Sequence, residues 1–221
     1  MAVKTIQKQF KKPLKKTLKK TLKKKSVSAR KRTIKKPIKK TKLTKMEGKK
    51  VPCVKLQTRV RDENVKSNPY KWKTLKTKNM FKNKKIVVVS LPGAFTPTCS
   101  SSHLPDFEKK YNELKKNGVD EVYCFSVNDA FVMHNWKNNL KIKKVKLIPD
   151  GNGEFTSKMG ALVKKNNLGF GERSWRYSMI VDNGKIIKIF SEPNMQDNHK
   201  TDPFSVSSVH SVLKFLNPKA N

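Results

Sequence analysis

Apolar positions fall into a regular pattern only from about residue 51 onward. Residues 86–91 form a continuous, mainly β-branched run, which is typical of a strand buried on both faces of a sheet. Residues 122–127 form a second such run, and residues 145–148 form a shorter one. The pattern predicts that all of these segments are β-strands.

Segments with a helical period separate and follow these strands. The first is expected to begin near Pro97 and to end near Asn117-Gly118. Its apolar side chains are Leu104, Phe107, Tyr111 and Leu114. Further helices are expected at residues 129–140, 154–162 and 207–216.

A hairpin signal lies near the end of the chain. Asp182-Asn183-Gly184 separates two β-rich runs, at residues 177–181 and 185–190. Strands that alternate with helices, followed by a hairpin and a last helix, predict an α/β layer fold with helices on both faces of the sheet.

Composition restricts the class of protein. The 221 residues suit one medium domain with an appendage, or two small domains, and three cysteines cannot form the disulfide framework of a small secreted protein. No apolar run approaches the roughly 18 residues that a membrane span needs, so we expect a soluble chain without membrane contact.

The net charge of +36 is concentrated at the N-terminus. Residues 1–50 hold 22 Lys and Arg against the single acid Glu47, which gives +21, and residues 51–221 hold 30 against 15, which gives +15. A Lys-Lys-Thr-Leu repeat recurs at residues 15–22. Such dense like charge with few apolar residues predicts a disordered tail over residues 1–44, ahead of a folded domain at 45–221.

The tail admits more than one function. A polycation neutralises phosphates, so non-specific DNA or RNA contact and residence in the nucleus are our first expectation. A cleaved leader for a mitochondrion or a plastid-type organelle is a second interpretation. A solvated extension of a cytoplasmic protein is the third.

Candidate chemistry lies where the strand at 86–91 leads into the first long helix. Thr96 is a good N-cap and Pro97 suits the first helical position, which places Cys99 in the first helical turn. Free backbone N–H groups and the helix dipole stabilise an anion there, so the reactive thiolate form is favoured. A buried, inert cysteine is the alternative, but the serines at 100–102 favour a polar, accessible pocket.

The pattern Pro92-x-x-x-Thr96-x-x-Cys99 resembles the active-site signature of the peroxiredoxins, and the surrounding residues resemble the type II (animal type V) subfamily. The other matching segments are residues 102–105, 126–132, 150–155 and 176–179. The resemblance covers the chain from about residue 45. It implies a thioredoxin-like three-layer fold with a central mixed sheet, and thiol-dependent reduction of hydrogen peroxide, alkyl hydroperoxides and peroxynitrite.

The resemblance also implies roles for single residues. Cys99 is then the peroxidatic nucleophile, which becomes a sulfenic acid. Thr96 hydrogen-bonds the peroxide and Pro92 shields the sulfur. Arg176, together with backbone N–H groups at Thr98 and Cys99, stabilises the thiolate and polarises the peroxide, whereas taken by itself Arg176 reads as a surface charge.

Regeneration of Cys99 is expected to need no second cysteine. Cys124 stands at the spacing of a resolving cysteine proposed for plant type II enzymes, but it lies inside an apolar run. Cys53 matches no resolving position, so we interpret it as structural. The C-terminal resolving cysteine of animal type V enzymes has no counterpart either, since residues 202–208 contain no cysteine. We therefore expect glutathione, with or without glutaredoxin, or thioredoxin to attack the sulfenic acid directly.

Other candidate sites are weaker. The histidines are scattered singly and no Gly-x-Gly-x-x-Gly run occurs, so neither a metal nor another cofactor is expected. We expect three aromatic residues in the core: Trp136, Phe131 and Phe95. Phe95 is alternatively a contact residue of the non-covalent homodimer that the resemblance implies. A chromatin-associated redox sensor that uses the basic tail is the alternative to an enzyme. A thiol oxidoreductase is disfavoured because no Cys-x-x-Cys pair is present.

Overall fold

The structure is a computed structural model that describes residues 43–62 and 64–218. The nuclear, nucleic-acid and disorder predictions for the tail concern residues that, apart from Leu43 and Thr44, lie outside this range. Leu43 begins a short 3-10 helix, Leu43–Met46, and its side chain is buried in the core. Among the described residues, no helix is long and apolar enough to cross a membrane.

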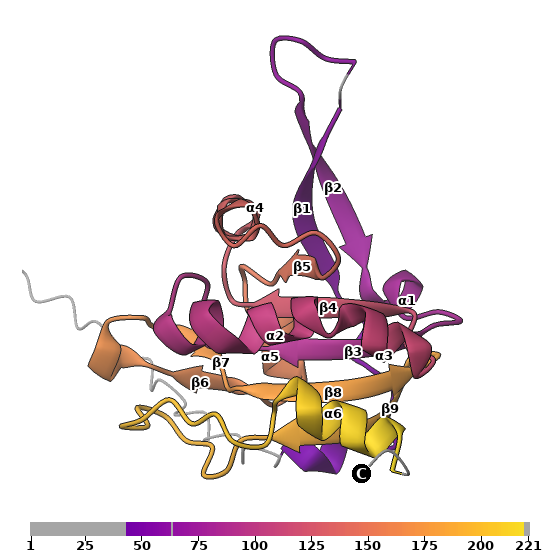
Figure 1. Cartoon of the computed structure of the whole chain (residues 1–221). Coiled ribbons are helices and arrows are strands. Elements are labelled where there is room, and N and C mark those ends of the chain that lie inside the picture. The colour runs from indigo at the N-terminus through magenta and orange to yellow at the C-terminus, as the bar shows by residue number, and fades with distance from the viewer. Residues whose placement is uncertain (1–42, 63, 219–221) are drawn as a thin grey trace, which may run out of the picture. The chain divides into compact units, whose positions relative to one another are not determined.

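A mixed sheet forms the centre of the fold (Figure 1). Its order is β5 (Lys146–Pro149), β4 (Glu121–Ser126), β3 (Lys85–Ser90), β8 (Tyr177–Asp182) and β9 (Lys185–Ser191). The first three strands are parallel, whereas β8 runs antiparallel to both β3 and β9. The apolar runs and the hairpin signal are thus confirmed as strands of one sheet.

Alternate residues of β3 face two separate cores. Val87 and Val89 belong to the core on one face, and Ile86 and Val88 belong to the core on the other. The first face is covered by α2 (Leu104–Lys109), α3 (Tyr111–Lys116), α4 (Ala130–Asn139) and α6 (Val209–Leu216). The second is covered by α5 (Glu154–Lys158), the residues around α1 (Thr77–Met80) and the Leu43–Met46 turn. This is the expected thioredoxin-like arrangement with helices on both faces.

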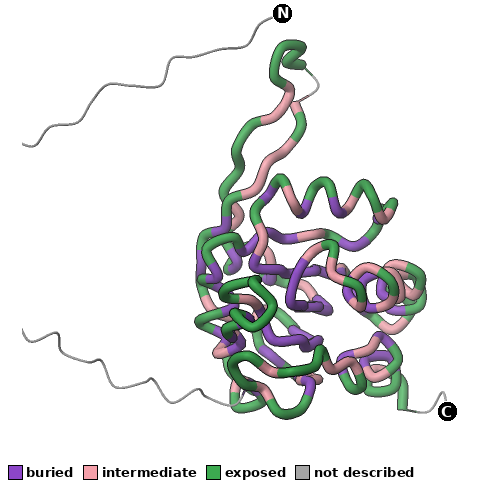
Figure 2. Tube along the Cα trace, turned by 90° about the vertical axis from the view of Figure 1, so that its left-hand side faces the viewer, coloured by how far each residue is buried: buried purple, intermediate pink, exposed green. Residues whose placement is uncertain are grey.

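The structure departs from the sequence prediction in several places. The first long helix, expected to end near Asn117-Gly118, is divided at Lys110 into α2 and α3. The helix expected at 154–162 ends at Lys158, because Gly160 adopts the left-handed conformation with φ 73° and the chain continues into β6 (Leu162–Lys164), which pairs with β7 (Glu172–Ser174). A hairpin of β1 (Lys55–Arg61) and β2 (Tyr70–Lys76) was not predicted. Apolar residues alternate with polar ones in both strands, at Leu56 and Val60 and at Tyr70 and Trp72, although most side chains of the hairpin are exposed or half-buried (Figure 2).

Candidate functional site

The link between β3 and α2 places Cys99 at the N-terminal end of a helix. The Ser100 amide donates to the Thr96 carbonyl at 3.0 Å, so the helix begins after Thr96, as the sequence predicts. A π-helical turn, Cys99–His103, then leads into α2. The Thr96 hydroxyl does not cap this helix but donates to the Gly93 carbonyl oxygen at 2.8 Å. It therefore closes the turn that follows Pro92.

Cys99 is fully buried, which corrects the expectation of an accessible pocket. Its side chain packs in the core beneath α2 with Leu91 and Leu104. Pro92 is buried as well. The chemistry of this cysteine is therefore decided by the few polar groups that reach it inside the protein.

Arg176 is one of those groups, and the interpretation of it as a surface charge is wrong. The residue directly precedes β8, is 1% exposed, and directs its Nη1 atom at the Cys99 sulfur at 3.5 Å. Nη1 also donates to Nδ1 of His103 at 3.0 Å, and Nη2 forms an ion pair with the Asp202 carboxylate. Arg176 thus links the cysteine to two residues that the sequence did not single out.

His103 belongs to the site, and the sequence carried a signal for it, since it lies within the matching segment 102–105. Its Nδ1 accepts from Arg176, so its Nε2 carries the proton and donates to the Ser207 carbonyl at 3.0 Å. Burial, and secondarily the positive charge of Arg176, lowers the pKa of His103 from 6.5 to about 3. A neutral imidazole therefore supports the guanidinium without adding a second positive charge.

Two further residues complete the surroundings of Cys99. Asn128, which follows β4, accepts from the Ala94 amide at 3.0 Å and from the Ser126 hydroxyl at 2.7 Å, so it fixes the link that carries Pro92 and Thr96. Phe204 places its ring 5.5 Å from the Arg176 guanidinium carbon and 4.8 Å from the His103 ring. A sequence signal for Asn128 existed, since it lies within the matching segment 126–132.

The other two cysteines lie in opposite environments. Cys124 is fully buried on β4, and burial, with the Cys99 sulfur as the smaller cause, raises the pKa of its thiol. Cys53 is exposed, so it does not pack in the core as a structural cysteine would. All three cysteines are free thiols. Raised pKa and burial make Cys124 a poor nucleophile.

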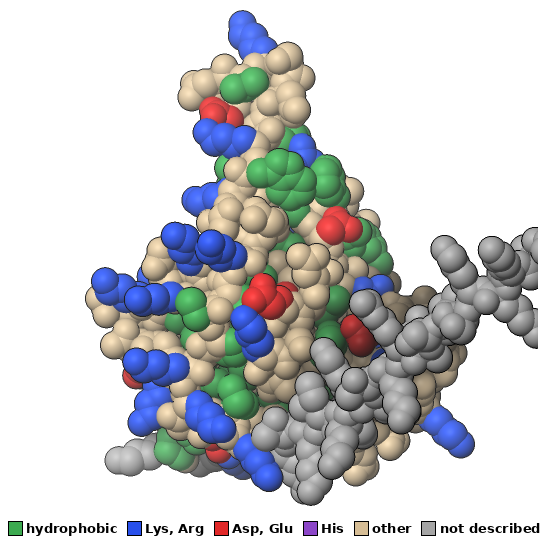
Figure 3. Space-filling view, turned by 180° about the vertical axis from the view of Figure 1, so that it is seen from behind, with side chains coloured by type: hydrophobic (Ala, Val, Ile, Leu, Met, Phe, Trp, Pro, Cys, Tyr) green, Lys and Arg blue, Asp and Glu red, His purple; other side chains and the backbone are tan. Residues whose placement is uncertain are grey.

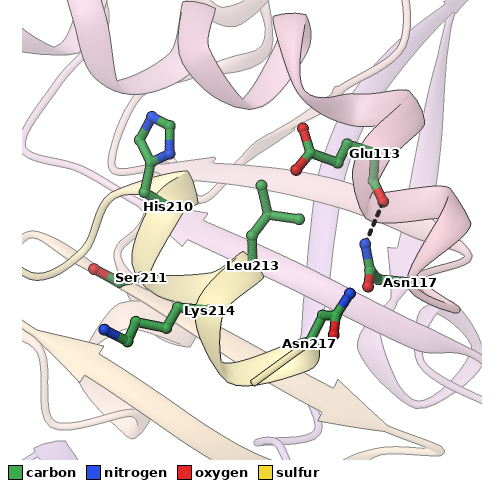
Figure 4. A pocket seen from close by; sticks show the side chains of 7 residues that line it. All are labelled: Glu113, Asn117, His210, Ser211, Leu213, Lys214 and Asn217. Atoms are coloured by element: carbon green, nitrogen blue, oxygen red, sulfur yellow. Dashed lines mark hydrogen bonds between the residues drawn. The ribbon is translucent and has the colours of Figure 1, made fainter. Parts of the chain in front are cut away.

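The surface also has a hollow whose lining residues do not include Cys99. A polar hollow of about 400 Å³ lies between α3 and α6 (Figure 4). It is lined by Glu113, Asn117, His210, Ser211, Leu213, Lys214 and Asn217. Within residues 43–62 and 64–218, no group of three or more His, Cys, Asp or Glu side chains is placed to hold a metal ion.

Two of the three predicted core aromatics are exposed. Trp136 is fully buried and donates from Nε1 to the Ser100 hydroxyl at 3.0 Å. Phe131 is 50% exposed and Phe95 is 53% exposed, so the expectation that these two are core residues is wrong within a single chain. Trp72, at 61% exposure, lies edge-on to Phe131. Apolar side chains gather beside the exposed hairpin in Figure 3.

Comparison with known proteins agrees with this geometry. Residues 46–205 match the Redoxin family. A peroxiredoxin of Synechocystis is 56% identical over 172 residues, which are 77% of this chain and 91% of the relative. A peroxiredoxin of Rhizobium etli is 54% identical over 173 residues, which are 78% of this chain and 97% of the relative.

The chain belongs to the peroxiredoxin family.

The solved structures place this peroxiredoxin in the same family. The crystal structure of the Plasmodium falciparum antioxidant protein, described as a 1-Cys peroxiredoxin, shares 40% sequence identity and a TM-score of 0.73. That match covers 78% of this chain and all of the Plasmodium chain. The resemblance seen in the sequence is thereby confirmed: the peroxiredoxin is a thiol-dependent peroxidase, and therefore an oxidoreductase, with a thioredoxin-like fold.

Proposed function

We propose that this peroxiredoxin reduces hydrogen peroxide, alkyl hydroperoxides and peroxynitrite at Cys99. The observation that carries the proposal is the 3.5 Å distance from Arg176 Nη1 to Cys99 Sγ, inside the protein. The thiolate sulfur bonds to one peroxide oxygen and the O–O bond breaks. The leaving group departs as water from hydrogen peroxide, as an alcohol from an alkyl hydroperoxide, each after taking a proton, or as nitrite from peroxynitrite, which leaves Cys99 as a sulfenic acid.

The polar groups around the sulfur suit a peroxide. Arg176 Nε is buried and has no hydrogen-bond partner among the described residues, so it is a donor that a peroxide oxygen could satisfy. The Thr96 hydroxyl already donates to Gly93, which leaves its oxygen to accept from a peroxide O–H. Pro92 is buried beside this turn and would keep water from the oxidised sulfur.

Regeneration is proposed to follow a one-cysteine cycle. Glutathione or thioredoxin attacks the sulfenic sulfur and releases water, and a second thiol then reduces the resulting mixed disulfide. The raised pKa and complete burial of Cys124 support this choice, as does the description of the Plasmodium relative as a 1-Cys peroxiredoxin. Glutaredoxin could supply the second step when glutathione supplies the first.

Peroxide consumption by the full chain, with glutathione, glutathione plus glutaredoxin, or thioredoxin as the reductant, tests the proposal. We expect Cys99→Ser to abolish turnover with every reductant, because no other described thiol contacts Arg176. Unimpaired turnover by Cys99→Ser would refute the assignment. A disulfide between Cys99 and Cys124 that forms at the turnover rate, detected by mass spectrometry, would replace the one-cysteine cycle with a two-cysteine cycle.

A non-covalent homodimer is proposed through exposed aromatic side chains, with Phe95 as the first candidate. Phe95 lies beside the active-site turn and is 53% exposed, and Phe131 and Trp72 are exposed as well. Large exposed apolar groups favour association. Sedimentation velocity is expected to show a dimer that Phe95→Ser weakens, whereas Phe170→Ser, at another exposed phenylalanine, leaves it intact. A monomeric wild-type chain would rule the dimer out.

The basic tail is proposed to decide where the enzyme resides, with the nucleus as the first expectation. The charge of +21 over residues 1–50 supports contact with nucleic acid, which weakens steeply with salt. Microscopy of the full chain and of a chain without residues 1–44 tests this proposal. An organelle pattern that depends on the tail would contradict nuclear residence.

A further inference from the structure

The segment of residues 202–208 supports the active site without being a helix or a strand itself. It is the last part of the link, residues 192–208, that connects β9 to α6 (Figure 1). Asp202 forms the ion pair with Arg176, Phe204 lies over the guanidinium, and the Ser207 carbonyl accepts from His103. Irregular backbone of this kind adopts a single conformation only when other groups satisfy its polar atoms.

One carboxylate satisfies the central part of this segment. Glu192 directly follows β9, is 2% exposed, and accepts hydrogen bonds from three consecutive residues, Ser205, Val206 and Ser207. The donors are three backbone amides and the hydroxyls of both serines, at 2.7–3.0 Å. Together they occupy both oxygens of the carboxylate.

The backbone of Glu192 is fixed to the other side of the site. Its amide donates to the Arg176 carbonyl at 3.1 Å, and its own carbonyl accepts from the Trp175 indole at 2.9 Å. Glu192 is therefore tied through its backbone to Trp175 and Arg176, just before β8, and through its side chain to the segment that covers Arg176. Glu192 therefore bridges the two, in addition to the ion pair between Asp202 and Arg176.

The charge state of Glu192 is consistent with this geometry. Burial acts to raise the pKa of its carboxyl, but the hydrogen bonds from Ser207 and Ser205 outweigh burial and leave the pKa below its ordinary value. The ionised form accepts all of these bonds, whereas a protonated carboxyl or an amide would present a donor to the same N–H groups.

We propose that Glu192 is a positioning residue for the peroxidase reaction, which holds the 202–208 segment so that Asp202, Phe204 and Ser207 keep Arg176 directed at Cys99. The inference rests on the proposed roles of Cys99 and Arg176. The Ser207 carbonyl accepts the Nε2 proton of His103, and Nδ1 of the same imidazole accepts a hydrogen bond from Arg176 Nη1. A shift of the segment would therefore remove the acceptors of both terminal nitrogens of Arg176.

A matched control exists elsewhere in the same chain. Glu108, on α2, also accepts from three consecutive backbone amides, those of Lys143, Lys144 and Val145, at 2.9–3.1 Å. It fixes a loop in the same way as Glu192, but that loop contributes no described contact to Cys99 or Arg176. Glu108→Gln therefore measures how the loss of such a carboxylate affects the fold, at a position that does not hold the surroundings of Cys99.

The experiment measures the rate constant for oxidation of Cys99 by hydrogen peroxide, in the full chain, by stopped-flow tryptophan fluorescence. We expect Glu192→Gln to lower it by about 10- to 100-fold, since misplacement of a positioning contact is that costly. Glu108→Gln is expected to stay close to the wild-type rate. Nitrogen-15 NMR of protein with nitrogen-15-labelled histidine reads the tautomer of His103, whose signal is identified by its loss in His103→Gln. We expect the Nε2–H tautomer in the wild type and a mixture of tautomers in Glu192→Gln.

The outcomes separate this inference from the proposed function. A wild-type rate in Glu192→Gln, an equal loss in both glutamine variants, or an unchanged His103 tautomer would overturn the role of Glu192. Continued reduction of hydrogen peroxide by Cys99→Ser would instead overturn the proposed function. If Glu192→Gln does not fold, the double variant Ser205→Ala/Ser207→Ala takes its place, because it removes two hydroxyl donors and leaves the carboxylate. A rate of Cys99 oxidation that is lower than in the wild type, by less than the 10- to 100-fold expected for Glu192→Gln, supports the proposal. The wild-type rate refutes it.

Discussion

Arg176 Nη1 lies 3.5 Å from Cys99 Sγ, although the two residues are 77 positions apart. The sheet explains this proximity. Ser90, at the end of β3, pairs with Tyr177, at the start of β8, because the two strands are antiparallel. Arg176 precedes Tyr177 and the Cys99 link follows Ser90, so both segments leave the sheet at the same edge.

Arg176→Lys is expected to lower the rate of Cys99 oxidation by roughly 100-fold, which is typical of the loss of a directed donor. Lysine keeps the charge but lacks the planar guanidinium that reaches Cys99, His103 and Asp202 together. Stopped-flow oxidation by hydrogen peroxide checks this. Arg173→Lys is the control, since Arg173 donates to the Val127 carbonyl and has no described contact with Cys99. Equal rates for the two variants would contradict the role of Arg176.

Cys124→Ala is expected to keep full peroxidase turnover with the reductant that serves the wild type. The thiol is buried and its pKa is raised, so its removal costs packing only, about 1 kcal/mol of unfolding free energy. Steady-state assays and urea unfolding measure the two quantities. Cys53→Ala, at the exposed cysteine, is the companion variant and is expected to change neither. Loss of turnover in Cys124→Ala would show that this cysteine resolves the sulfenic acid.

His103 is expected to make the fold sensitive to mild acid. The unfolded chain takes up a proton near pH 6.5, whereas the folded protein does so only near pH 3, so stability is complete above pH 6.5 and falls as the pH drops toward 3. At pH 5 the loss amounts to about 2 kcal/mol. Urea unfolding at pH 7.5 and pH 5 is expected to show this loss in the wild type and a smaller loss in His103→Gln. The exposed His134→Gln serves as the control and should behave as the wild type does.

Asn128→Ala is expected to weaken both stability and activity. It leaves the Ala94 amide and the buried Ser126 hydroxyl without their acceptor, at a cost of about 1–3 kcal/mol. The released link carries Thr96 and Cys99, so peroxide oxidation of Cys99 should slow as well. Thermal unfolding and stopped-flow oxidation test these effects against Asn138→Ala, at an exposed position on α4. A stable variant with the wild-type rate would mean that the link needs no support from β4.

Much of the fold could be predicted because its signals are local. The β-branched run at 86–91, the Asp182-Asn183-Gly184 turn and the helix start at Pro97 each depend on residues close in sequence. The β1–β2 hairpin was missed because its alternation is short and its strands are mostly polar, with side chains that are largely exposed or half-buried. The length of the 154–162 helix was overestimated because β6 pairs with β7, a contact that the helical period does not reveal.

The sequence by itself determined the family, the nucleophile and the helix start that holds it, since these are written in one continuous motif from Pro92 to Cys99. Only the tertiary structure decided how Cys99 is surrounded. It buried the sulfur, brought Arg176 to it across the sheet, placed His103 and Asp202 on the guanidinium, and let Glu192 hold the segment that carries Asp202. These residues come from different elements, and their interactions exist only after long-range strand pairing has closed the distance between them.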